Sequence, residues 1–293
     1  MSQTFGGLGN IAYLCHHYNI INLNPYDNGK AFKINFRGGV ILLGLPLLFS
    51  SCGNEDNPVV TPTPTSTPTD PGIALSEVTS THKGYMIGKN GKAYATLADE
   101  KAFNSDQAPV AVIVYVGESA GDADTGYRGL AIALSDANDG ATCAWGDDTA
   151  TGLAINSTFP QAKADLSGIA NTNALKAFPA FKAAIYAYSE APLATTSNWF
   201  LPSSGQLIKI LIAYGYELDS NPWFDDVIPS SVIASLNTAI TSAGGTALSD
   251  GEWYWTSTDS GAATAICLCL GGNIQVLNNA KGANQRVRPF LAF

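Results

Sequence analysis

A proline-rich stretch divides the chain and limits where it can fold. Residues 58–72 contain five prolines. Proline fixes φ and has no amide N–H, so this density prevents helix and sheet pairing and favours an extended polyproline II spacer of about 40 Å. Since 46% of the residues are hydrophobic, there is enough apolar material for a core, and we expect one folded domain over residues 73–293.

The residues ahead of this spacer have the parts of a secretory signal. Basic residues up to Arg37 precede the apolar run 40–49, and small residues then precede Cys52. The run is shorter than the roughly 20 residues that cross a bilayer. The pattern predicts a signal over residues 30–52, of the lipoprotein type in which Cys52 is lipidated and becomes the mature N-terminus. The alternative is a buried helix with a chance cysteine.

The two segments that flank this signal have separate interpretations. Residues 1–29 show no periodicity and are interpreted as an upstream segment ahead of the true start. Residues 53–72 form an acidic and Pro/Thr-rich linker, and the acidic residues directly after Cys52 resemble the surface-export signal of Bacteroidetes lipoproteins. We therefore expect a lipid-anchored outer-membrane protein exposed at the cell surface.

The charge of the chain restricts its partners. The net charge is −9 and the isoelectric point is about 4.7. Neither nucleic acid nor an anionic membrane surface attracts such a chain. We expect no nucleic-acid partner, and contact with the membrane through the lipid anchor only.

The sequence offers little catalytic chemistry. After the signal, His82 is the only histidine, so a Ser-His-Asp or Cys-His arrangement lacks a base within reach. No Walker-type phosphate loop is present, and the Cys-x-Cys at 267–269 lacks histidine partners for zinc. The acidic turn 121–124 lacks the EF-hand pattern. We therefore expect no enzyme, no catalytic residue, no metal and no cofactor.

Local signals in the domain predict both strands and helices. Asn90-Gly91 between strand-like runs predicts a hairpin. The apolar runs 111–117 and 128–135 predict neighbouring strands. Four tryptophans are interpreted as scaffold aromatics, with a sugar-stacking platform as the alternative; they are Trp199, Trp223, Trp253 and Trp255.

Three helical segments are expected. Residues 162–190 predict a helix with a break near Pro179. Ser203 and Gln206 form a capping box ahead of apolar residues at helical spacing. A further helix is expected over residues 229–243, ended by two glycines.

The C-terminal segment alternates with a period of two. Ile266, Leu268 and Leu270 alternate with Cys267 and Cys269, so one set faces a core and the other faces away. An exposed strand face usually carries Thr, Lys, Glu or Arg. The small and apolar outward set therefore indicates a displayed surface. The alternative is a strand buried on both faces.

Three motifs in order carry a family resemblance: Trp-Phe-Leu-Pro-Ser at 199–203, Tyr-Trp-Thr-Ser-Thr at 254–258 and Arg-Val-Arg-Pro at 286–289. Over residues 84–293 the chain resembles the C-terminal domain family of bacterial collagen-like adhesins. It resembles more closely the variable proteins of diversity-generating retroelements in gut Bacteroidetes. The resemblance implies an α+β, C-type-lectin-like fold with a small twisted antiparallel sheet and flanking helices, related to the formylglycine-generating enzyme.

In that family, the terminal segment is rewritten by adenine-directed mutagenesis of a template copy. Mutating an Asn codon can give Cys, Gly, Ala, Thr, Ile or Leu, which fits the outward set, but not Gln, so Gln275 and Gln285 are fixed or come from another codon. The resemblance implies a fixed scaffold of Trp255, Ile266, Leu268, Leu270, Ile274, Val276 and Val287. The predicted ligand-contact residues are Ser260, Gly261, Ala263, Thr264, Cys267, Cys269, Gly271, Gln275, Leu277, Asn278, Ala280, Gly282 and Ala283.

Three functions follow as candidates. The favoured one is a surface-displayed lipoprotein that binds an unknown protein or glycan through a diversified C-terminal face. A fixed adhesin or fibre-tip subunit is the alternative, and a metal-dependent enzyme of the formylglycine-generating fold is the third. The face is small and apolar, which suits a protein better than a hydroxylated glycan. Cys267 and Cys269 are interpreted as free and semi-exposed. The alternatives are a structural role, or a disulfide between one of them and Cys143.

Overall fold

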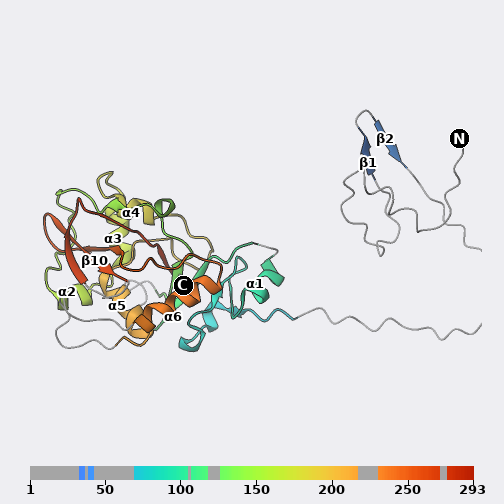
Figure 1. Cartoon of the computed structure of the whole chain (residues 1–293), viewed down its shortest axis with the longest axis horizontal. Helices are drawn as coiled ribbons and strands as arrows, with labels where there is room; N and C mark the ends of the chain where they lie inside the picture. The colour runs from blue at the N-terminus through green and yellow to red at the C-terminus, as the bar shows by residue number, and fades with distance from the viewer. Residues whose placement is uncertain are drawn as a thin grey trace, which may run out of the picture. The chain divides into compact units, whose positions relative to one another are not determined.

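The chain divides into two compact units, residues 1–66 and 67–293 (Figure 1). The computed structural model describes residues 33–36, 39–42, 69–104, 107–117, 126–216, 230–270 and 276–293. In the first unit, β1 (Lys33–Phe36) and β2 (Gly39–Leu42) form an antiparallel hairpin within the predicted signal. Cys52 and the linker up to residue 68 lie outside the described residues. None of the described helices is long and apolar enough to cross a membrane.

The second unit is built on a six-stranded antiparallel sheet with the order β13-β7-β6-β4-β5-β3. The strands are β3 (Ile73–Ala74), β4 (Met86–Ile87), β5 (Lys92–Tyr94), β6 (Ala111–Val116), β7 (Gly129–Ala133) and β13 (Phe290–Ala292). The predicted hairpin is confirmed, because β4 pairs with β5 and Gly91 has a φ of +77°, in the left-handed region that favours glycine. The predicted neighbouring strands are the pair β6 and β7.

The described residues of this unit hold six α-helices. They are α1 (Leu97–Asn104), α2 (Phe159–Ala164), α3 (Gly168–Leu175), α4 (Lys182–Ala187), α5 (Ser204–Ala213) and α6 (Ser230–Ser242). The helix expected over 162–190 is three helices: the break expected near Pro179 separates α3 from α4, and a further break at Asp165 separates α2 from α3. The carboxylate of Asp165 accepts a hydrogen bond from the Ser167 N–H at 3.0 Å, a local turn that competes with helix. The capping box of α5 is confirmed, because the Gln206 side chain accepts a hydrogen bond from the Ser203 N–H at 2.9 Å.

A smaller three-stranded antiparallel sheet carries the C-terminal segment. Its order is β11-β10-β9, with β9 (Trp253–Asp259), β10 (Thr264–Cys269) and β11 (Val276–Ala280). Figure 1 shows α5 and α6 on one side of β10 and α4 on the other. A two-stranded pair completes the fold, β8 (Cys143–Ala144) with β12 (Asn284–Gln285).

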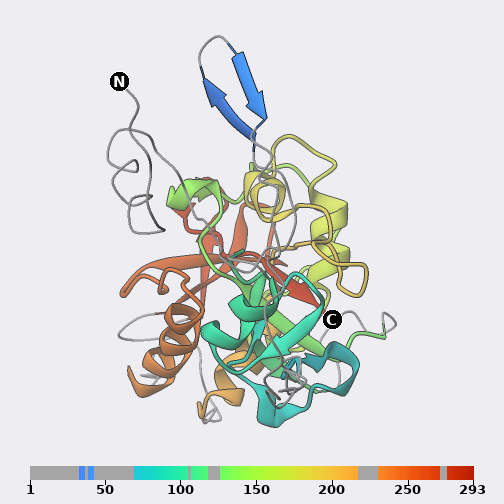
Figure 2. The ribbon, with the colours of Figure 1, turned by 90° about the vertical axis from the view of Figure 1, so that its right-hand side faces the viewer.

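Alternate residues of the six-stranded sheet contribute to two apolar clusters. Val112 of β6 and Phe290 of β13 belong to the main cluster with α5 and α6. Ile113 and Leu291, one residue further along each strand, belong to a second cluster on the opposite face. Figure 2 shows this sheet with the red C-terminal strand at its edge. The period of two therefore buries both faces of the sheet.

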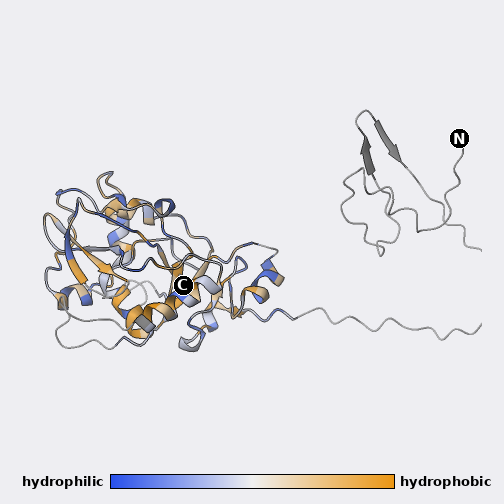
Figure 3. Ribbon diagram, viewed as in Figure 1, coloured by the Kyte–Doolittle hydropathy of each residue, from blue (hydrophilic) through white to orange (hydrophobic). Residues whose placement is uncertain are grey.

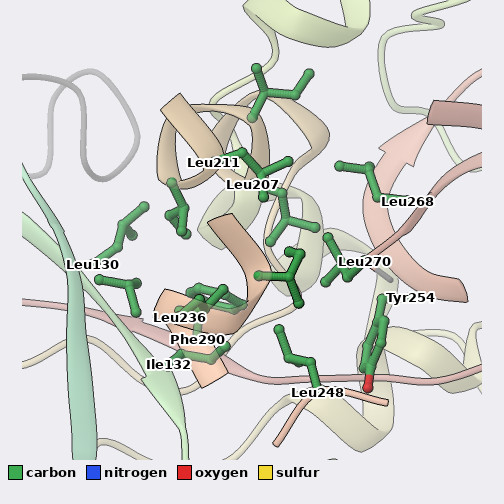
Figure 4. Close-up of a cluster of buried hydrophobic side chains, with 14 of the residues drawn as sticks. Leu130, Ile132, Leu207, Leu211, Leu236, Leu248, Tyr254, Leu268, Leu270 and Phe290 are labelled. Atoms are coloured by element: carbon green, nitrogen blue, oxygen red, sulfur yellow. The ribbon is translucent and has the colours of Figure 1, made fainter. Parts of the chain in front are cut away.

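The main cluster lies between the two sheets. Figure 4 shows Leu207 and Leu211 of α5 near Leu268 of β10, with Leu130 and Ile132 of β7 in the same cluster. All five side chains are at most 4% exposed. Figure 3 shows the same apolar character as orange along α5 and β10. The α+β class is confirmed, and the lectin-like topology stays a prediction.

Candidate ligand-binding surface

Strand β9 carries a buried polar run. Thr256, Ser257 and Thr258 are 0% exposed. The Thr256 hydroxyl donates to the Ile266 carbonyl at 2.8 Å, and the Thr258 hydroxyl donates to the Asp165 carboxylate at 2.6 Å. Buried hydroxyls cost little when they are hydrogen-bonded. The motif at 254–258 is therefore part of the scaffold.

The last residue of β9, Asp259, forms a buried ion pair with Lys281. The Lys281 Nζ lies 3.2 Å from one carboxylate oxygen and 3.3 Å from the other, and each side chain is 1% exposed. The Thr151 hydroxyl and the Gly261 N–H donate to the same carboxylate, at 2.5 and 3.1 Å. The ammonium also lies 5.0 Å from the centre of a Trp145 ring. Because both charges are paired and hydrogen-bonded, the cluster is tolerated in the interior and fixes the backbone around it.

Three loops meet around this ion pair. The Lys281 N–H donates to the Ala263 carbonyl at 2.9 Å, which joins the β9–β10 turn to the segment after β11. The Asn156 N–H donates to the Asp259 carbonyl at 2.8 Å, and the Gly146 N–H donates to the Lys281 carbonyl at 3.2 Å. These bonds attach the loop that precedes α2. We call the exposed and half-buried residues of these loops and of the adjoining strand ends the loop surface. It comprises residues 147–155, 261–264, 278–280 and 282–284, of which 278–280 are the end of β11.

The predicted contact residues have different exposures. The exposed ones are Ala263, Asn278, Ala280 and Gly282, and the half-buried ones are Gly261, Thr264, Leu277 and Ala283. The buried ones are Ser260, Cys267 and Cys269. Gly271 and Gln275, and the scaffold residue Ile274, lie outside the described residues. The other predicted scaffold residues are buried, as expected.

The prediction that Cys267 and Cys269 face outward is wrong. They are 0% and 6% exposed, and Cys267 belongs to a cluster with Trp145 that covers the second face of β10. The strand is therefore buried on both faces. Ser260, also predicted as a contact, is 5% exposed. Burial raises the pKa of Cys267 to about 12, so its thiol carries little nucleophilic thiolate. Cys143, Cys267 and Cys269 form no disulfide within the described part of the chain.

The arginine motif at 286–289 is also structural. Arg288 is 2% exposed, and its Nε donates to the Asp136 carboxylate at 2.6 Å. Its other nitrogens donate to the carbonyls of Ala133 and Thr246, both at 3.0 Å. Arg286 donates to the second oxygen of Asp136 at 3.3 Å. Asp136 therefore ties the C-terminal segment to the end of β7.

The motif at 199–203 follows the same pattern. Phe200 exchanges two backbone hydrogen bonds with Phe290 of β13, at 2.8 and 2.9 Å. The Leu201 N–H donates to the hydroxyl of Thr172 on α3 at 3.0 Å. These contacts extend the edge of the six-stranded sheet towards α5. All three motifs therefore build the frame that supports the loop surface.

The sequence alone does not identify residues 147–155 as part of a binding surface. Asp147 and Asp148 are exposed there, and Ile155 is 49% exposed. Hydrogen bonds from Thr149 hold the pKa of Asp147 below its usual value. The bond from Thr151 to Asp259 joins residues 108 positions apart. No local pattern predicts such a bond, although a polar loop of this composition is where binding residues gather.

The loop surface presents small side chains, two carboxylates and one exposed large apolar side chain, Ile155. This combination can contact a ligand by close approach of backbone and by hydrogen bonds. Among the residues that the structure describes, no group of three or more His, Cys, Asp or Glu side chains is placed to hold a metal ion.

Comparison with known proteins gives one distant likeness. No family model matches the chain, and no curated protein matches it. A fimbrial protein from Bacteroides ovatus, solved by crystallography, is similar with a TM-score of 0.46 and 15% sequence identity. The match covers 72% of this chain and 48% of that protein, so it spans about half of the longer chain. A likeness at this TM-score assigns neither a fold nor a function.

Proposed function

We propose that residues 67–293 form a ligand-binding head that contacts its ligand through the loop surface. The proposal rests on a difference in solvent exposure between neighbouring residues at the end of β11. Ala280 and Gly282 are exposed, whereas Lys281 between them is 1% exposed and paired with Asp259. The exposed side chains are replaceable because they lie in solvent, and the backbone is held because the ion pair is buried.

A backbone of this kind tolerates changed side chains. Substitutions at exposed positions away from special contacts usually alter the free energy of unfolding by less than about 0.5 kcal/mol. Antibody loops use the same division between a rigid frame and adaptable contacts. The diversified face that we propose is narrower than the sequence predicts. Its core is Ala263, Asn278, Ala280 and Gly282.

The chemistry of the loop surface favours a protein ligand. Small side chains allow a partner's backbone to approach closely, and the exposed Ile155 supplies an apolar contact. Asp147 and Asp148 complement lysine or arginine on a partner. The same carboxylates repel the phosphates of nucleic acid.

The proposal includes display at the cell surface through a lipid on Cys52 and the extended linker. This part rests on the sequence pattern. Metabolic labelling with a fatty-acid analogue is expected to mark the wild-type chain and to leave Cys52→Ala unlabelled. A Cys52→Ala chain that still carries the label contradicts the anchor.

A fixed adhesin that binds host polysaccharide or protein through the same surface is the second candidate, and neither candidate includes catalysis. Sequencing the locus in many cells of one culture separates the two. Substitutions clustered at codons 263, 278, 280 and 282 that spare Trp255 and Leu268 support diversification. An invariant segment supports the fixed adhesin.

A displayed library tests binding itself. Randomising the four core positions of the face is expected to keep the chain folded on the surface of yeast and to yield binders to several unrelated proteins. A matched library at Ala265 and Cys267, both 0% exposed on neighbouring β10, is expected to lose folded display. Equal display and equal binder yield from the two libraries would rule out the proposed division between face and scaffold.

A further inference from the structure

A recess lies between α3 and the segment 196–200. Its volume is about 220 Å³, and its eight lining residues include Tyr127, Asn173 and Trp199. It shares no residue with the loop surface. Binding of a ligand in this recess would therefore not depend on binding at the loop surface.

Two lining residues of this recess, Ser197 and Asn198, are held by hydrogen bonds. The Ser197 N–H donates to the Ala292 carbonyl at 2.8 Å, and the Ser197 hydroxyl accepts from the Ala292 N–H at 2.8 Å. The Asn198 side chain accepts from the Ala191 N–H at 2.8 Å and donates to the Tyr188 hydroxyl at 3.1 Å. The Ser197 bonds hold segment 196–200 against β13, and the Asn198 bonds hold it against residues 188–191. They preorganise the recess, which lowers the cost of ordering on binding.

Three other polar groups at the recess have no hydrogen-bond partner among the residues that the structure describes. Within the described chain, no hydrogen bond involves the Tyr127 hydroxyl, the Trp199 indole N–H or the Asn173 side-chain amide. Tyr127 and Trp199 are half-buried and Asn173 is exposed, so all three are open to solvent. They come from three separate segments and meet at one cavity. Convergent polar groups on an aromatic wall are the usual make-up of a small-ligand site.

The charge and size of the recess restrict the ligand. All eight lining residues are uncharged, so a phosphate, a carboxylate or an ammonium group would lose its hydration without gaining a counter-charge. The volume is below the roughly 300–1,000 Å³ of pockets for drug-sized ligands. Two aromatic side chains offer apolar faces with a polar edge. This combination fits a compact neutral molecule with many hydroxyl groups and one apolar ring face.

We propose that this recess binds the ring of a neutral sugar. Tyr127 and Trp199 contact the ring and donate hydrogen bonds from their O–H and N–H, and the Asn173 amide bonds a pair of hydroxyls. The interpretation of Trp199 as a scaffold aromatic is compatible with this role, because its ring also packs on the cluster behind the sheet.

The test uses the full chain and free monosaccharides: glucose, galactose, mannose, N-acetylglucosamine and fucose. Saturation-transfer NMR and calorimetric titration are expected to show saturable binding of at least one of them. Asn173→Ala changes an exposed side chain without a hydrogen-bond partner, so its fold is expected to be intact and its affinity about two- to tenfold lower. Trp199→Phe keeps an aromatic ring but removes the N–H, and is expected to lower the affinity by a similar factor.

Asn278→Ala on the loop surface is the matched control, and it is expected to bind the sugar as the wild type does. Two results overturn the proposal. One is that no sugar of the panel binds saturably. The other is that a sugar binds and neither Asn173→Ala nor Trp199→Phe weakens it. Neither result bears on the loop surface, whose own test uses protein ligands.

Discussion

The ammonium of Lys281 lies 3.2 Å from a carboxylate oxygen of Asp259, and water reaches only 1% of either side chain. Asp259 ends β9 and Lys281 directly follows β11. The pair therefore joins the two outer strands of the sheet at the edge where the loop surface lies. This geometry makes the ion pair the main constraint on the backbone of that surface.

Removing one partner of this pair is expected to destabilise the protein strongly. Lys281→Met leaves the Asp259 carboxylate buried without its counter-charge, which typically costs about 3–5 kcal/mol of unfolding free energy. Urea unfolding followed by circular dichroism measures the loss. The control is Lys92→Met, which breaks a pair with Asp70 whose side chains are 39% and 24% exposed and is expected to change stability little.

The double variant Lys281→Met/Asp259→Leu is expected to be more stable than Lys281→Met alone. It removes the uncompensated charge, and buried ion pairs replaced by apolar side chains often lose little stability. If the double variant is less stable than the single one, the buried charge is not the main cost. The loss then comes from packing around Trp145 or from the Thr151 and Gly261 donors that Asp259→Leu leaves unpaired.

The two arginines of the 286–289 motif are expected to differ in how they tolerate lysine. Arg288 is 2% exposed and bonds Asp136, Ala133 and Thr246 in three directions, which one ammonium cannot reproduce. Arg288→Lys is expected to cost about 1.5–3 kcal/mol. Arg286→Lys at a side chain 23% exposed is expected to cost less than about 1 kcal/mol. Equal midpoints in urea for the two variants contradict this ranking.

The sequence predicted those features that depend on residues close together in the chain. The capping box joins Ser203 to Gln206 across three residues, and the hairpin turn contains Gly91 with a positive φ. The inward set of β10 is readable because side chains two apart share a face. Each of these features needs only a short window of residues, so a pattern is enough.

The sequence could not show that both faces of β10 are buried. Cys267 pairs with Trp255 and is covered by Trp145, which lies more than a hundred residues earlier in the chain. A small side chain beside a large ring fits a packed interior as well as it fits a displayed surface. The candidate site was therefore predicted in part: the turn residues near Ala263 and Ala280 are exposed, and the central strand is not.

The buried thiols are expected to resist alkylation in the folded protein. Burial raises the pKa of Cys143 to about 11 and that of Cys267 to about 12. At pH 8 the thiolate fraction of Cys143 is then on the order of one in a thousand. Peptide mapping after iodoacetamide is expected to find both unmodified in the native chain and modified in 8 M urea. Rapid native labelling of Cys267 would show that β10 is open to solvent.

The same shift predicts loss of stability at alkaline pH. The folded chain keeps the Cys143 proton up to a pKa of about 11, whereas the unfolded chain loses it near pH 9. The protonated Cys143 thiol therefore contributes its full share to the free energy of unfolding below pH 9. This contribution falls as the pH rises towards 11, by up to about 1.4 kcal/mol per pH unit. Cys143→Ala lacks this contribution. Urea midpoints at pH 8 and pH 10 should fall further for the wild type than for the variant, and equal falls argue against the shift.

The start of α5 is expected to require glycine at position 205. A Cβ on Gly205 would lie 2.3 Å from the Asp165 carbonyl oxygen and 2.4 Å from that of Lys163, both backbone atoms at the end of α2. Gly205→Ala must push the two helices apart, and overpacking of this kind costs about 1–3 kcal/mol. Gly282→Ala on the loop surface is the matched control, because its Cβ would meet nothing within 4 Å. In thermal unfolding, Gly205→Ala is expected to have a lower melting temperature than the wild type, and Gly282→Ala an unchanged one. A Gly205→Ala chain with the melting temperature of the wild type would mean that α2 and α5 are not held in contact.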